Sequence, residues 1–210
     1  MFIKIILTFL LHMNIVRSFT SSMIIPSHDS CLIRKIIIND NKMPSIYTSY
    51  DFDCNKIKKN TFLTAEHIYP QSLLDEYQTY DMHNIVKTLN TLNVNRSNYK
   101  FHDFINETDN NWKKLEYNNY VNHKKKLFVP NSNSRGLISR SILYMCKEYG
   151  FKLNKIIDKP TLIKWYYTYC PTREEIYHNA VVTYYQNRNN IFISKYNKKN
   201  MAIKKYIERL

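Results

Sequence analysis

The sequence has few glycines and few acidic residues, and it has no long apolar run. Glycine occurs only twice in 210 residues, whereas Asn and Lys are abundant, a bias that fits an AT-rich genome. The apolar stretch from Ile5 to Val16 is shorter than the about 20 residues of a transmembrane helix, so we expect no stable membrane anchor. No internal repeat and no long low-complexity tract is present, and the length suits one domain with a real core.

The four cysteines form no Cys-x-x-Cys pair, and no histidine is spaced to complete a zinc site with them. They allow one or two disulfides with three full pairings. Two of them fall within apparent helices, where buried free thiols are the alternative. The cysteines are Cys31, Cys54, Cys146 and Cys170, and the last two are the helical ones.

Basic residues dominate the charge. Lys and Arg outnumber Asp and Glu by 31 to 17, which gives a formal charge of +14 and a pI near 9.5. Such a surface attracts polyanions, with nucleic acid as the first expectation and an anionic membrane surface as the second. A soluble basic protein without such a partner is the alternative. The hydrophobic fraction of 44% argues against a disordered chain.

The N-terminus has the pattern of a secretory signal. Lys4 supplies a positive n-region, Ile5 to Val16 is mostly apolar, and Val16-Arg17-Ser18 offers a cleavage site. We therefore predict a signal peptide over residues 1–18, a domain over residues 19–210 and a secreted protein. An apolar N-terminal strand and an uncleaved anchor are the alternatives.

Two strands and a short helix are expected in the first half of the chain. Phe62 to Ile68 alternates weakly like a strand, and Asp81 to Lys87 fits a second strand or a turn. Asn93 to Phe101 fits a short helix with Asn93 near its start. Residues 19–60 carry no recognisable chemistry, although residues 31–38 fit a short buried strand or helix. Residues 102–122 are predicted to form a loop-bearing connection.

The C-terminal third is helical in pattern. Ile138, Ile142 and Met145 recur at helical spacing before Gly150, which is a stop signal. Pro160 fits the start of the next helix.

A third helix is predicted from Pro171-Thr172-x-x-Glu175, which reads as a capping box, and it should run to about Gln186. A Lys-rich tail is expected to close the chain as a short helix. The aromatic stretches 165–167 and 184–185 are expected in the core rather than on a base-stacking surface.

Several polar motifs follow one another in the chain, and the first is a Glu-His pair. Adjacent strand residues point to opposite faces, so Glu66 and His67 should share a cavity only if the chain bends after Glu66. Pro70 is consistent with a chain that leaves the strand there. The motifs are Glu66-His67-x-x-Pro70-x-Ser72, Asp81-x-His83-Asn84, Asn93-x-x-Arg96-Ser97-Asn98, Arg135-Gly136-x-x-x-Arg140, Glu175-x-x-x-Asn179 and Asn187-Arg188-Asn189.

This ordered set resembles the endonuclease I family of non-specific nucleases, roughly over residues 60–193. The resemblance implies an α+β fold: a single domain with a ββα-metal core of the His-Me finger type and a helical C-terminal third. It also implies a metal-dependent endonuclease that hydrolyses phosphodiester bonds of DNA and RNA and leaves 5′-phosphate ends. Mg²⁺ is the expected cation, with Mn²⁺ or Ca²⁺ as alternatives, and we expect a monomer.

Phosphodiester hydrolysis needs a base for the attacking water and positive charge for the phosphorane and the leaving oxygen. A neutral histidine suits the first task, and a hard divalent cation with oxygen ligands suits the others. By the resemblance, His67 is the general base and Glu66 and Asn93 are metal ligands. Arg96 matches a position close to the phosphate.

Three further residues are expected to orient this site. Asn84 and Asn98 resemble residues that pin the loop and orient His67, and His83 is either such a residue or a packed core histidine. Glu66 as an ordinary exposed carboxylate and Asn93 as an incidental Asn are the alternatives.

Other positions are read as structural, or depart from the family's usual pattern. Arg140 is expected to face solvent or an internal salt bridge. The usual Pro, Gly and Arg of the family are replaced by Lys87, Ser97 and His178.

Two other functions stay open. The first is a basic nucleic-acid-binding protein of the same fold that is catalytically weak or inactive. The second is a secreted interaction protein whose charge serves a cell-surface polyanion. Metal-dependent plasmid nicking separates both from a nuclease.

Overall fold

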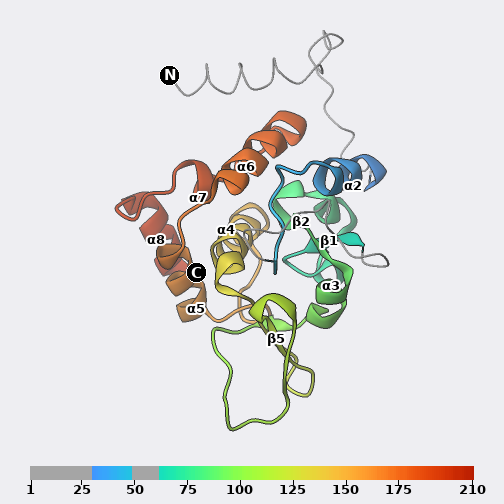
Figure 1. Cartoon of the computed structure of the whole chain (residues 1–210). Helices are drawn as coiled ribbons and strands as arrows, with labels where there is room; N and C mark the ends of the chain where they lie inside the picture. The colour runs from blue at the N-terminus through green and yellow to red at the C-terminus, as the bar shows by residue number, and fades with distance from the viewer. Residues whose placement is uncertain (1–29, 49–61) are drawn as a thin grey trace.

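The computed structural model describes residues 30–48 and 62–210 (Figure 1). The predicted signal peptide, residues 1–18, and Cys54 lie outside the described residues, as does the side chain of Cys31, so the disulfides that involve them stay predictions. Within the described ranges, no helix is both long and apolar enough to cross a membrane. The described elements combine small sheets with a helical C-terminal part, which confirms the predicted α+β single domain.

The predicted strand–strand–helix unit is present. Strands β1 (Leu63–His67) and β2 (Ile85–Leu89) pair antiparallel, and helix α3 (Asn90–Arg96) follows directly and packs against both (Figure 1). Pairing continues to the end of β1, where His67 lies opposite Ile85. The predicted bend after Glu66 is therefore wrong, because the backbone stays in the ladder through His67 and turns only afterwards.

Three short 3-10 helices connect the two strands: η3 (Gln71–Leu73), η4 (Glu76–Tyr80) and η5 (Met82–Asn84). Each end of η4 is tied down. Asp75 and Gln78 form a capping box at its start, and Asp81 follows it as the N-cap of η5, accepting a hydrogen bond from the amide of His83. The connection is thus a series of closed turns that returns the chain to β2.

Helix α3 lies earlier in the sequence than predicted. It begins at Asn90 and ends at Arg96, so Asn93 is in its middle and Phe101 belongs to strand β3 (Lys100–Phe101). The physical reason is Ser97, whose φ of 52° and ψ of −131° lie outside the helical region and stop the helix.

A second sheet follows, with strand order β3-β6-β5-β4. Strands β4 (Trp112–Lys114), β5 (Tyr120–Asn122) and β6 (Leu127–Val129) are antiparallel neighbours, while β3 pairs parallel with β6. The segment predicted as a loop therefore contains two short strands, with the 3-10 helix η6 (Glu116–Asn118) between them.

The N-terminal part packs on the β1–β2 hairpin. Helix α2 (Ser30–Asn39) contacts both strands, which settles the open choice between strand and helix. The chain then runs beside β2, where Ser45 bridges Lys87 and the amide of Ile46 donates to the Lys87 carbonyl at 2.9 Å. This contact brings Tyr47 next to β1.

The C-terminal helices are α4 (Ser132–Tyr149), α5 (Lys159–Thr168), α6 (Arg173–Gln186), α7 (Ile191–Ser194) and α8 (Met201–Arg209). Their predicted ends are confirmed. Gly150 follows α4 with a left-handed φ of 69°, Pro160 lies in the first turn of α5, and Thr172 and Glu175 form the capping box of α6. Figure 1 shows α4 between α5 and α8 on one side and the β1–β2 hairpin on the other.

A buried ion pair joins α4 to α6. Arg140, 1% exposed, donates Nε and Nη2 to the two carboxylate oxygens of Glu175 at 2.8 and 2.7 Å. Gly136 makes room for it, because a Cβ there would lie 2.5 Å from Arg140 Nη2. Of the two predicted alternatives for Arg140, the internal salt bridge is the correct one.

The aromatic and cysteine predictions are correct in part. Trp165 and Tyr166 are buried in the main core, as predicted, but Tyr184 is 60% exposed on α6. Cys146 is a buried thiol in α4, whereas Cys170 is exposed and lies after the end of α5. The helix prediction for Cys170 is wrong because the chain must turn there before the capping box of α6.

Candidate active site

A cavity of about 340 Å³ opens between the end of β1 and helix α3. Five of the seven predicted site residues line this cavity. The other lining residues are Ala65 in β1 and four residues in the turn after β1 or at the end of α3. The predicted residues are Glu66, His67, Asn93, Arg96 and Asn98, and the others are Pro70, Gln71, Ser72 and Ser97. Asn84 and His83 do not line it.

Glu66 is almost fully buried, at 2% exposure, so the alternative of an ordinary exposed carboxylate is wrong. Its Oε1 accepts a hydrogen bond from the Tyr47 hydroxyl at 2.9 Å and lies 3.3 Å from Arg96 Nε. Burial raises the pKa of Glu66 to about 7, although Arg96 and Tyr47 both act to lower it. A buried carboxylate of this kind favours a cation in the adjoining cavity.

The histidine of the pair has a fixed tautomer. His67 Nε2 lies 2.9 Å from the backbone carbonyl oxygen of Thr79, which can only accept, so Nε2 carries the hydrogen. The basic nitrogen is then Nδ1. Burial lowers the pKa of His67 below its ordinary value, with Arg96 acting in the same direction and the Thr79 bond opposing them. The ring is therefore neutral near pH 7 and able to accept a proton.

The amide of Asn93 is oriented by β1. Its Nδ2 donates to the Ala65 carbonyl at 3.1 Å, which leaves Oδ1 as an acceptor on a residue that lines the cavity. Oxygen ligands from one carboxylate and one amide suit a hard cation such as Mg²⁺, which keeps several waters. Among the described residues no cluster of three His, Cys, Asp or Glu could hold a metal. Glu66 and Asn93 are the residues of this cavity that could hold such a cation.

The guanidinium of Arg96 is held by contacts with other groups of the protein. The residue is 1% exposed, and its Nη atoms donate to the backbone carbonyls of His67, Ile68 and Ser97 at 3.2, 2.5 and 2.9 Å. Its Nε faces Glu66 at ion-pair distance without hydrogen-bond geometry, and its guanidinium stacks 4.6 Å from the Phe101 ring. These contacts hold the end of β1 and Glu66 in place.

The two predicted Asn residues lie in different surroundings. Asn84 is buried and spans the connection, because its Oδ1 accepts from the Tyr69 amide at 2.6 Å and its Nδ2 donates to the Tyr69 carbonyl at 2.9 Å. It fixes the turn that follows His67. Asn98 is exposed on the rim of the cavity.

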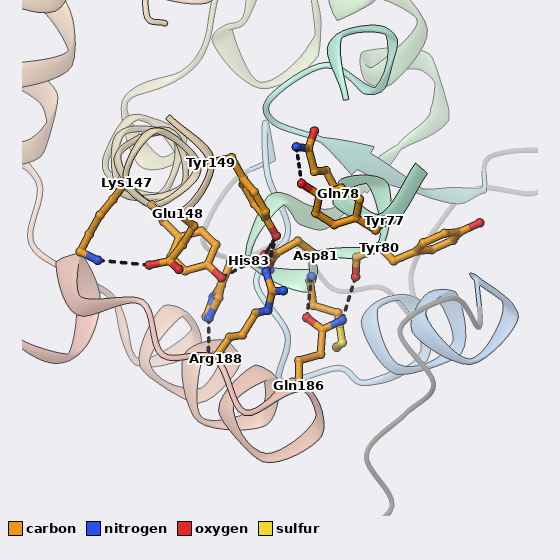
Figure 2. Close-up of polar contacts among 12 residues, drawn as sticks. Tyr77, Gln78, Tyr80, Asp81, His83, Lys147, Glu148, Tyr149, Gln186 and Arg188 are labelled. Carbon is orange, nitrogen blue, oxygen red and sulfur yellow. Dashed lines mark hydrogen bonds and ion pairs between the residues drawn. The ribbon is translucent and has the colours of Figure 1, made fainter. Parts of the chain in front are cut away.

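His83 packs in the core instead. It is 4% exposed, its ring lies 4.4 Å from that of Tyr144, and its Nε2 lies 3.0 Å from the Arg188 carbonyl (Figure 2). It lines a separate small cavity together with His178. His83 is thus a packed histidine in this structure, and a role in orienting the site stays a prediction.

The C-terminal motif secures the segment that carries Thr79. Asp81 Oδ2 accepts from Tyr144, Tyr149 and Arg188 at 3.0, 2.6 and 3.0 Å. Gln186 accepts from the Met82 amide and donates to the Tyr80 carbonyl, so its side chain is hydrogen-bonded to the backbone on both sides of Asp81 (Figure 2). These bonds fix the end of η4, whose Thr79 carbonyl orients His67.

Two residues that contact the side chains of this site were not predicted from the sequence. Thr79 acts through a backbone carbonyl, which no side-chain pattern reveals. Tyr47 lies in the segment that showed no recognisable chemistry, yet its hydroxyl contacts Glu66. Burial and the neighbouring carboxylate raise the pKa of Tyr47 well above its ordinary value, so this hydroxyl stays a donor.

Comparison with known proteins gives one family. The family profile described as Endonuclease I matches residues 11–197. The chain is similar to Endonuclease-1 of Buchnera aphidicola subsp. Baizongia pistaciae (strain Bp), with 31% identity over 121 residues, 57% of this chain and 49% of that protein.

Two proteins of Aeromonas hydrophila are also similar. A periplasmic deoxyribonuclease is 31% identical over 116 residues, 55% of this chain and 47% of that protein. An extracellular deoxyribonuclease is 30% identical over 116 residues, 55% of this chain and 49% of that protein. The chain thus spans about half the length of the curated relatives it matches. Because the family profile covers most of the sequence, the resemblance is confirmed, and the chain belongs to the endonuclease I family.

Proposed function

We propose that this protein is a divalent-metal-dependent, sequence-non-specific endonuclease that hydrolyses DNA and RNA to products with 5′-phosphate ends. The observation that carries the proposal is the meeting of Glu66, His67 and Asn93 in one cavity of a chain with a formal charge of +14. Mg²⁺ is the proposed cation. Glu66 Oε2 and Asn93 Oδ1 are the proposed ligands.

In the proposed reaction, His67 Nδ1 takes a proton from the water that attacks the phosphorus. The Thr79 carbonyl keeps the hydrogen on Nε2 and stabilises the imidazolium that forms, since it accepts from that ring nitrogen at 2.9 Å. A cation held by Glu66 and Asn93 supplies positive charge for the phosphorane and the leaving oxygen. Arg96 positions Glu66 and the backbone of His67, and Asn84 fixes the turn that follows.

The substrate is proposed to bind through its phosphates. The excess of Lys and Arg suits contacts to the backbone of any sequence. Two of the matched relatives are named deoxyribonucleases, one periplasmic and one extracellular, which supports DNA as a substrate and a secreted location. Cleavage of RNA, the signal peptide over residues 1–18, the domain over residues 19–210 and the monomeric state belong to the same proposal.

Plasmid nicking by the purified protein at low salt tests the proposal. Supercoiled DNA should become nicked and then linear with Mg²⁺, remain supercoiled with EDTA, and be cleaved again when Mg²⁺ is added in excess. A labelled RNA treated in parallel tests the wider substrate range. If the protein binds DNA but never cleaves it, the nuclease proposal is wrong and the hypothesis of a nucleic-acid-binding protein without catalysis remains. Heparin binding without either activity would leave the polyanion-binding protein.

A further inference from the structure

A tyrosine from the N-terminal segment contacts the buried carboxylate of the site. Tyr47 has no measurable exposure, and its hydroxyl donates to Glu66 Oε1 at 2.9 Å. Arg96 Nε faces the same oxygen at 3.3 Å. Both groups hold Oε1, so Oε2 is the oxygen left to face a ligand in the cavity that Glu66 lines.

The backbone of Tyr47 is held in a conformation that bulky residues avoid. Its φ of 64° lies in the left-handed region, which is an outlier for a large aromatic residue and is kept only where the surroundings enforce it. The surroundings do so here. The Tyr47 amide donates to Ser134 Oγ at 2.7 Å, and Asn119 Nδ2 donates to the Tyr47 carbonyl at 2.8 Å. Its ring also packs edge-on against Phe128, with centroids 4.9 Å apart.

These anchors come from parts of the chain that are remote in sequence and do not line the cavity. Ser134 lies in the first turn of α4, and Asn119 and Phe128 belong to the second sheet or its borders. Ser134 is itself fixed, because its amide and its hydroxyl both donate to Asn131 Oδ1. The strained backbone therefore places one hydroxyl against one carboxylate oxygen, with support from three elements.

We propose that Tyr47 is a positioning residue for the divalent-cation site, because its hydroxyl fixes the Glu66 carboxylate with one oxygen turned away from the cation and the other available to it. The inference rests on the proposed function. It assigns a role in metal binding to the N-terminal segment, whose residues lie outside the strand–strand–helix unit.

The test compares Mn²⁺ binding by the wild type and by Tyr47→Phe, a substitution that removes only the hydroxyl. Each protein is titrated into Mn²⁺, and binding is measured as the loss of the electron paramagnetic resonance signal of the free ion. Tyr166→Phe is the matched control, since Tyr166 is equally buried and its hydroxyl has no hydrogen-bond partner among the described residues. We expect Tyr47→Phe to weaken Mn²⁺ binding by about 10- to 150-fold, which corresponds to the loss of one hydrogen bond to a charged group. The Mg²⁺ concentration for half-maximal cleavage should rise in step, and Tyr166→Phe should match the wild type in both.

Unchanged Mn²⁺ affinity in a folded Tyr47→Phe variant would overturn the inference. If that variant does not fold, Ser134→Ala replaces it, because it removes the acceptor of the Tyr47 amide without touching the cavity, and Ser139→Ala in the same helix is its control. Ser134→Ala should then bind Mn²⁺ more weakly than Ser139→Ala, and equal binding overturns the inference. A wild-type protein that neither binds Mn²⁺ nor cleaves DNA would refute the proposed function itself. If the wild type does both and only the result expected for the variants is missing, the inference about Tyr47 fails and the proposed function stands.

Discussion

Lowering the pH should destabilise the protein through His178. His178 is 6% exposed, its Nε2 lies 2.8 Å from the Met82 carbonyl, and its Nδ1 is buried without a hydrogen-bond partner among the described residues. Burial lowers the pKa of His178 from 6.5 to about 4, and His83, with its ring 6.2 Å away, acts in the same direction. The Met82 hydrogen bond and Asp81 oppose this shift.

The sign and size of the effect follow from linkage. The folded pKa is depressed, so the unfolded chain binds a proton below pH 6.5 that the folded His178 does not bind until about pH 4. Each pH unit in this window removes about 1.4 kcal/mol from the free energy of unfolding. Lowering the pH from about 7.5 to about 5 should therefore remove roughly 2 kcal/mol at this position.

Urea unfolding of the wild type and of His178→Gln at both pH values measures this difference. Glutamine keeps a donor for the Met82 carbonyl but does not titrate. Glu66 acts in the opposite direction, because its raised pKa stabilises the fold as the pH falls below about 7, so the comparison of the two proteins is the informative quantity. The wild type should lose roughly 2 kcal/mol more than the variant between the two pH values. Equal losses would refute the assignment of a buried neutral His178.

Three other outcomes are expected. Ser97→Gly should raise the free energy of unfolding by about 1 kcal/mol and the Tm by about 2–4 °C in a thermal melt, because Ser97 has a φ of 52°, which glycine adopts without strain. Glu175→Ala should cost about 3–5 kcal/mol in urea unfolding, since it leaves Arg140 buried and unpaired, whereas Glu208→Ala in an exposed pair should have little effect. DNA binding in EDTA, followed by fluorescence anisotropy, should weaken on the order of 100-fold between about 50 and about 200 mM salt if about four phosphates are contacted, and a flat response would contradict backbone recognition.

Elements whose ends are set by local chemistry could be predicted from the sequence. The capping box of Thr172 and Glu175, the left-handed Gly150 and the early Pro160 each act within a few residues of where they stand. The location of Glu66 and His67 in one site could also be predicted, because the two residues are adjacent in the motif and the hairpin places both at one cavity.

Contacts between remote parts of the chain could not be predicted. Nothing near Tyr47 indicates that it reaches Glu66, because the contact depends on anchors such as Ser134, 87 residues away. The burial of Arg96 depends in the same way on the backbone carbonyls of His67 and Ile68, which lie 29 and 28 residues away in the sequence. The end of α3 was misjudged because Ser97 holds a conformation more usual for glycine.

Cleavage of plasmid DNA by His67→Ala tests the central claim most directly, with His123→Ala as the control because His123 is exposed and does not line the cavity. If His67 is the general base, its loss should slow the cleavage step by about 100- to 10,000-fold at saturating Mg²⁺, while DNA binding and the Tm stay close to those of the wild type. His123→Ala should cleave like the wild type. Full activity in His67→Ala would contradict the assignment of this cavity as the active site.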